Sequence, residues 1–159
     1  MKRIIPIIFI ILSICIGSFP DAVGKHGVVV SSNKYASEIG IQILQNGGNA
    51  IDAAVAMGFA LAVVHPGAGN IGGGGFMVIR LADGTVKTID FRETAPSAAY
   101  KDMFLDDSLN VIPDKSWSTS WSSGVPGSVA GFGLAHEKYG LLSWRKLLIP
   151  SINLAQLGH

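Results

Sequence analysis

The chain of 159 residues, of which 48% are apolar and 14% charged, is long enough for one packed domain and too apolar to be disordered. Its formal net charge is +1 and no basic cluster lies beyond Lys2 and Arg3, so the sequence predicts no nucleic-acid partner. The single cysteine, Cys15, excludes a disulfide framework, and the spacing of cysteine and histidine predicts no metal site.

Residues 1–24 have the pattern of a secretory signal peptide. A short basic start precedes the apolar stretch Ile4–Ile16, which falls short of the roughly 20 apolar residues that a membrane span needs. Ala22–Gly24 then offers the small residues of a cleavage site. We therefore expect a periplasmic or secreted protein with no stable membrane span after signal removal, and a mature domain over residues 25–159. Lipid attachment at Cys15 is the alternative.

The mature chain is predicted to begin with a strand and two helices. The β-branched run Gly27–Ser32 indicates a buried strand. Apolar residues recur at helical spacing over Tyr35–Asn46, and Gly47 with Gly48 is expected to end that helix. Asn49 is expected to cap a second helix over Ala50–Val64. This second helix is apolar on nearly every face, which predicts a buried, central position.

A glycine-rich segment and a β-hairpin follow. Gly67–Gly75 contains the literal pattern G-x-G-x-x-G, but a helix precedes it and a strand follows, the reverse of a dinucleotide site. A tight passage from helix to strand is favoured, and a role for the glycine amides stays open. Phe76–Leu81 and Val86–Phe91 are predicted strands, joined by the turn signal Asp83-Gly84.

The last part of the chain is predicted to hold a long loop and two more helices. Residues 93–127 are rich in turn-forming residues. Ser128 is expected to cap a helix that ends at Tyr139. Ser143 is expected to cap a final helix, which Pro150 would kink or restart.

The end of the predicted hairpin carries the best candidate for a binding site. Phe91 is expected to point inward, which leaves Asp90 and Arg92 on the opposite face. A guanidinium at the end of a strand can hold a carboxylate through two parallel hydrogen bonds. From the residues alone, an ion pair between Arg92 and Asp90 or Glu93 explains the pattern equally well.

Five blocks of the sequence together resemble the γ-glutamyltransferase family, also called γ-glutamyltranspeptidase or glutathione hydrolase. The blocks occur in the family's order and at its spacing. They are Gly47–Ala56, His65–Met77, Asp90–Pro96, Asp102–Asp106 and Ser123–Gly127.

The resemblance implies an α+β fold of the N-terminal-nucleophile hydrolase class, an αββα sandwich of two stacked sheets with helices outside. It implies a precursor that cuts itself into a large and a small subunit, and a threonine nucleophile that passes the γ-glutamyl group of glutathione to water, amino acids or peptides. No cofactor is implied. The family's carboxylate-binding arginine falls on Arg92, and Glu93 beside it is expected to help order the pocket.

The resemblance places residues 25–159 in the N-terminal part of the large subunit. We therefore expect this chain to be an incomplete fragment that contains no catalytic residue and is inactive alone. Its expected partners are glutathione or other γ-glutamyl compounds and the small subunit. Two alternatives stay open: a noncatalytic module for γ-glutamyl binding or assembly, and a relative that acts on poly-γ-glutamate or acylated β-lactams.

Overall fold

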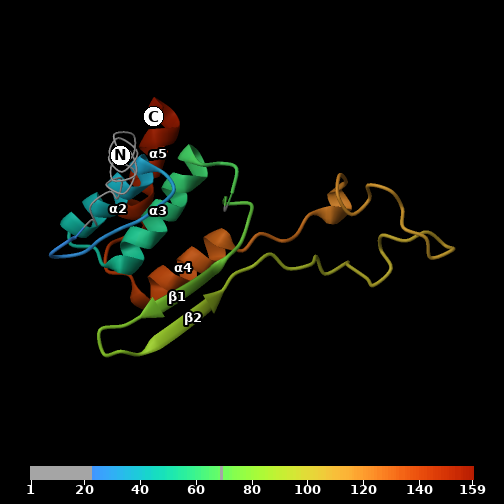
Figure 1. The fold of residues 1–159 in the computed structure, drawn as a ribbon, viewed down its shortest axis with the longest axis horizontal. Helices are drawn as coiled ribbons and strands as arrows, with labels where there is room; N and C mark the ends of the chain where they lie inside the picture. Colours follow the sequence, from blue (N-terminus) through green and yellow to red (C-terminus); the bar gives the residue numbers. More distant parts are fainter. Residues whose placement is uncertain (1–22, 69) are drawn as a thin grey trace, which may run out of the picture.

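The computed structural model describes residues 23–68 and 70–159 (Figure 1). The predicted signal peptide therefore lies almost entirely outside the described residues. The elements are α2 (Lys34–Gln45), α3 (Ala50–Val64), β1 (Phe76–Arg80), β2 (Val86–Asp90), the short 3-10 helix η1 (Ser120–Ser122), α4 (Ser128–Tyr139) and α5 (Trp144–Leu157).

Helix α3 lies at the centre of the helical layer, as its apolar sequence predicts. It packs against α2, α5 and α4, while α4 also contacts β2 of the hairpin (Figure 1). The predicted cap is confirmed: the Asn49 side chain accepts from the amides of Ile51 and Asp52, at 2.9 and 3.0 Å. The Asp52 carboxylate accepts in return from the Asn49 amide at 2.9 Å, which completes a capping box.

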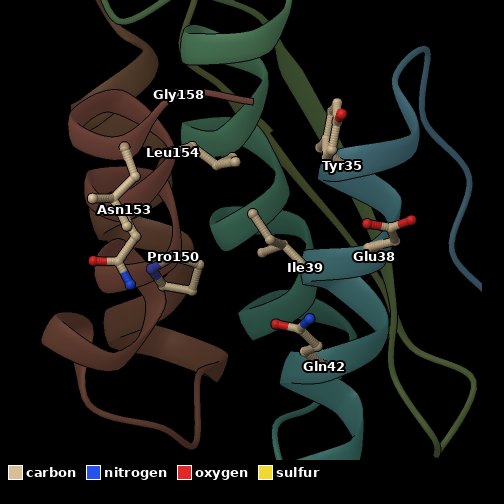
Figure 2. Close-up of a pocket in the computed structure, with 9 residues that line it drawn as sticks. Tyr35, Glu38, Ile39, Gln42, Pro150, Asn153, Leu154 and Gly158 are labelled. Carbon is tan, nitrogen blue, oxygen red and sulfur yellow. The ribbon is translucent and has the colours of Figure 1, made fainter.

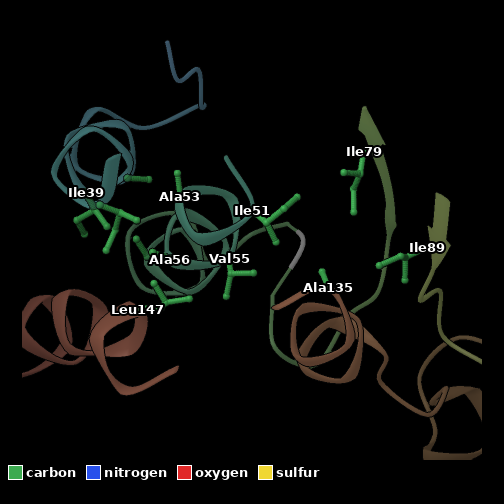
Figure 3. Close-up of a cluster of buried hydrophobic side chains, with 12 residues drawn as sticks. Ile39, Ile51, Ala53, Val55, Ala56, Ile79, Ile89, Ala135 and Leu147 are labelled. Carbon is green, nitrogen blue, oxygen red and sulfur yellow. The ribbon is translucent and has the colours of Figure 1, made fainter. Parts of the chain in front are cut away.

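The hydrophobic core gathers side chains from all four long helices and from the hairpin (Figure 3). Small residues of α3 allow its neighbours to approach closely. The buried members are Ala36, Ile39, Ile43, Ile51, Ala53, Val55, Ala56, Ala60, Ile79, Ile89, Ala135 and Leu147. Burial of α3 is nevertheless incomplete, because Ala54 is exposed and the last turn, Leu61–Val64, is half-buried.

Helix α2 begins and ends close to the predicted limits. Asn33 caps it by accepting a hydrogen bond from the Tyr35 amide at 2.9 Å. Gly47 follows the helix with φ of +87°, a conformation that glycine adopts at little cost. The predicted glycine stop is therefore confirmed.

Strands β1 and β2 form the predicted antiparallel hairpin, with Phe76 opposite Asp90. At the turn, Gly84 has φ of +87° and the Asp83 carboxylate accepts from the Thr85 amide at 2.8 Å. This hydrogen bond lowers the pKa of Asp83 below its usual value. Ile79 and Ile89 face the core, while Phe76 and Val78 are exposed on the other face.

The prediction of a buried strand at Gly27–Ser32 is wrong. Val28 and Val30 are 62% and 84% exposed, and Val29 alone of the three valines is half-buried against the core. The segment finds no pairing strand within residues 23–68 and 70–159. A β-branched run indicates an extended backbone, but burial depends on a neighbour that the local sequence does not specify.

The last two helices match the predicted limits, but their caps and the effect of Pro150 differ in detail. Ser128 does not cap α4 but is its first residue and is buried. The Gly73 carbonyl takes the capping role, since it accepts from the amides of Gly127 and Ser128 at 2.9 and 3.0 Å. Ser143 occupies the N-cap position of α5, although its side chain forms no capping hydrogen bond within the described chain. Helix α5 runs through Pro150 without a restart.

Candidate functional site

The segment that follows β2 is held from both sides by other backbone. On one side, the amide of Phe91 donates to the Gly75 carbonyl at 2.9 Å, and the Gly75 amide donates back at 3.3 Å. On the other side, the Val125 amide donates to the Thr94 carbonyl at 2.8 Å, and the Thr94 amide donates back at 3.3 Å. Arg92 and Glu93 lie between these two pairs, so their backbone has a fixed path.

The side chain of Arg92 lies on the face opposite to Phe91, as the alternation of side chains along a strand predicts. Its guanidinium lies over the Phe76 ring, 5.9 Å from the centroid, and its amide donates to the Asp90 carboxylate at 3.0 Å. Phe91 points inward and is half-buried against the core, as predicted. The Asp90 carboxylate thus binds the backbone of Arg92, and the exposed guanidinium rests on an aromatic ring.

A cavity of about 560 Å³ opens beside these two residues. Its volume lies within the range of small-molecule sites. Among the described residues that line it, Arg92 and Glu93 carry charges. The other lining residues are Gly72, Thr94, Ala95, Pro96, Ala99, Met103, Phe104, Trp121, Ser122, Ser123 and Gly124. The site therefore combines one cation and one anion with a wall of mixed apolar and hydroxyl side chains.

The far wall of the cavity comes from the long loop that projects from the body of the molecule (Figure 1). Leu105 and Val111 pair as an isolated bridge, and the Asp106 carboxylate accepts from the amides of Ser108 and Asn110, each at 2.9 Å. The hydrogen bond from Asn110 is the main cause of the lowered pKa of Asp106. Turns of this kind, with the short 3-10 helix η1, set the course of the loop.

A second hollow lies between α2 and α5 and holds none of the predicted site residues. Its volume is about 280 Å³. Figure 2 shows the side chains that α2 and α5 contribute to it. They include Tyr35, Glu38, Ile39, Gln42, Pro150, Asn153 and Leu154.

Two further features concern metals and membranes. Within residues 23–68 and 70–159, no three His, Cys, Asp or Glu side chains gather closely enough to hold a metal ion. None of the helices in this part of the chain has the length and apolar character to cross a bilayer.

Comparison with known proteins identifies the family. The model of the Gamma-glutamyltranspeptidase family matches residues 36–159. The chain is 53% identical over 134 residues to the glutathione hydrolase proenzyme of Escherichia coli K12, which covers 84% of this chain and 23% of that protein. It is 48% identical over 140 residues to the glutathione hydrolase proenzyme of Bacillus subtilis 168, covering 86% of this chain and 24% of that one.

Solved structures agree with the sequence matches. The γ-glutamyltranspeptidase of Helicobacter pylori superposes with a TM-score of 0.84 at 54% identity, over 88% of this chain and 40% of that chain. The transpeptidase CapD of Bacillus anthracis gives a TM-score of 0.66 at 36% identity, over 86% of this chain and 40% of that one.

This chain belongs to the γ-glutamyltranspeptidase family. The predicted class, an N-terminal-nucleophile hydrolase fold of which the chain forms one part, is confirmed by these structural neighbours. The chain spans about a quarter of the length of the curated relatives that it matches.

Proposed function

We propose that this chain supplies the γ-glutamyl-binding part of a glutathione hydrolase precursor. In this proposal the complete protein transfers the γ-glutamyl group of glutathione to water, amino acids or peptides. The observation that carries the proposal is the exposed Arg92 guanidinium beside a ligand-sized cavity, on a backbone fixed from both sides. Family membership supports the same reading, since the relatives are named as glutathione hydrolases.

A γ-glutamyl donor matches the charges of this cavity. Its free α-carboxylate suits the planar guanidinium of Arg92, which can donate two parallel hydrogen bonds. Its α-ammonium group suits the Glu93 carboxylate, which lines the same cavity. Holding both groups would orient the γ-carbonyl for attack and lower the entropic cost of reaction.

The attacking group is assigned to another part of the precursor. In the family resemblance, a threonine that begins the small subunit is the nucleophile and becomes acylated by the γ-glutamyl group. We place no catalytic residue in residues 1–159 and name the small subunit as the partner that completes the site. The naming of several relatives as proenzymes supports a precursor. Residues 1–24 support export to the periplasm or beyond the cell.

The proposal is tested in a complete precursor. This chain would replace its matching 134-residue region in the Escherichia coli proenzyme, and hydrolysis of γ-glutamyl-p-nitroanilide would be followed. Arg92→Ala should lower kcat/KM roughly 100- to 1,000-fold, mainly through KM, because two hydrogen bonds between charged groups are lost. Arg92→Lys should recover only part of the loss, because an ammonium lacks the planar fork.

Arg80→Ala is the matched control, since Arg80 is another exposed arginine, at the end of β1, but lies outside the cavity lining. It should leave both constants unchanged. Normal KM for Arg92→Ala in an active chimera would refute the assignment of the carboxylate to Arg92.

A further inference from the structure

Three glycines, one in the loop before β1 and two at the start of α4, lie against the backbone and ring of Phe91. A Cβ atom added to Gly74 would lie 2.6 Å from the Phe91 carbonyl oxygen and 2.7 Å from the Glu93 nitrogen. One added to Gly127 would lie 2.8 Å from the Phe91 carbonyl carbon. One added to Gly131 would lie 2.5 Å from both Cβ and Cδ1 of Phe91. All of these separations are shorter than real Cβ contacts, so each position must lack a side chain.

Other glycines of the same segments carry no such requirement. A Cβ at Gly72 or at Gly133 would meet nothing within 4 Å among the described residues. Gly133 lies on the same helix as Gly131 and only two residues further along. The close fit is therefore specific to the surroundings of Phe91.

The ring of Phe91 connects the proposed site to the helical core. It packs edge-on against Phe132 of α4, with 5.7 Å between centroids, and Phe132 packs in the same way on Phe59 of α3 at 5.4 Å. Gly131 is the neighbour of Phe132 and leaves the space in which the Phe91 ring lies against α4. The packing of its ring and the hydrogen bonds of its backbone to Gly75 together fix Phe91, the residue that directly precedes Arg92.

We infer that Gly131 is a positioning residue for the γ-glutamyl donor, acting through Phe91 on Arg92. The inference rests on the proposed function of Arg92. A methyl group at position 131 would push the Phe91 ring and its backbone away from α4, and Arg92 follows directly in the chain. A guanidinium that binds a carboxylate through two parallel hydrogen bonds loses both when it moves by a small part of the donor–acceptor distance, because both bonds depend on the same geometry.

The test is Gly131→Ala in the same chimeric precursor, with two donors. Alanine favours a helix over glycine, so the substitution should not weaken α4 itself. For γ-glutamyl-p-nitroanilide we expect kcat/KM to fall roughly 10- to 100-fold, mostly through a higher KM. For 4-aminobutyryl-p-nitroanilide, which lacks the α-carboxylate, we expect no change. A general structural defect would instead lower the rates of both donors alike.

A double-mutant cycle with Arg92→Ala separates positioning from an independent effect. If Gly131 acts through Arg92, Gly131→Ala should have no further effect on KM once the guanidinium is absent. The inference would be overturned if the two substitutions raised KM additively. It would also be overturned if Gly131→Ala lowered kcat/KM equally for the two donors. Gly133→Ala on the same helix should behave as the unmodified chimera.

Phe91→Leu provides a second route that adds no atoms to the crowded space. It removes the ring that Gly131 accommodates and should give the same loss, confined to the donor with an α-carboxylate. If Gly131→Ala yields no folded precursor, the Phe91→Leu substitution serves as the test. An unchanged KM for Phe91→Leu would then overturn the inference. If Arg92→Ala alone leaves KM unchanged, the proposed function of Arg92 fails together with the inference. If only Gly131→Ala and Phe91→Leu are without effect, the inference alone fails.

Discussion

Asp52 shows how one side chain can join distant parts of this chain. Its fully buried carboxylate accepts from the Asn49 amide and from the Leu141 amide, which lies 3.1 Å from each of its oxygens. The Leu142 amide lies 3.4 Å away. The Asn49 side chain adds a hydrogen bond of 2.6 Å to the Tyr139 carbonyl. The start of α3 is thereby tied to the connection between α4 and α5.

We expect Asp52→Asn to loosen this connection, because the amide nitrogen that replaces one oxygen cannot accept hydrogen bonds from the backbone. The cost should be about 1–3 kcal/mol for the buried donor left unsatisfied. Hydrogen exchange of the Leu141 and Leu142 amides in the chimeric precursor would measure it. The exposed Asp107→Asn serves as control. Unchanged protection of both amides would show that Asp52 is dispensable for the junction.

At the scale of elements, the position of α3 is set by its small side chains and by the close packing of neighbouring helices against them. Leu147 of α5 is fully buried among the residues of this core (Figure 3). Close packing leaves few ways to fill the space that a missing side chain would vacate. The arrangement of α3 and α5 therefore depends on the shapes of a few core residues.

Leu147→Ala should destabilise the precursor by about 2–5 kcal/mol, through lost burial and the cavity that remains. Urea unfolding followed by tryptophan fluorescence would report it, since Trp144 lies on the same helix and packs on Phe59. Leu157→Ala, on the same helix but 84% exposed, should change stability little. Equal effects of the two substitutions would contradict the central role given to this core.

At the scale of the whole molecule, apolar surface lies exposed along extended backbone. Phe76 and Val78 on the hairpin and Val28 and Val30 near the start are all more than half exposed. The described sheet has two strands, so each strand has an unpaired edge. Unpaired edges and apolar patches favour association with other chains.

Residues 25–159, produced without the predicted signal peptide, should therefore self-associate. Sedimentation velocity should show species larger than a monomer, and Val78→Lys should reduce them, because a charge on an edge strand opposes pairing. Leu157→Lys is a control, since Leu157 is 84% exposed but lies on α5, outside the hairpin. A monodisperse monomer of the unmodified chain would contradict this prediction.

Local patterns predicted most of the elements, and distant contacts explain the errors. The cap at Asn49 and the inward direction of Phe91 follow from a few adjacent residues, and both are confirmed. The strand expected at Gly27–Ser32 failed because burial requires a partner elsewhere. Trp121, on the far wall of the cavity, escaped prediction because turns without periodicity connect it to Arg92.

The carbonyl of Gly73 occupies backbone amides at the start of α4 that could otherwise bind an anion. The positive end of a helix commonly attracts phosphate or carboxylate through its free amides. At α4 the amides of the N-cap residue Gly127 and of the first helical residue Ser128 already donate to the Gly73 carbonyl, so an oxygen of the chain itself faces the start of this helix. If Arg92 holds the ligand carboxylate as proposed, the negative charge is met by its guanidinium and not by the amides of Gly127 and Ser128, which Gly73 already occupies.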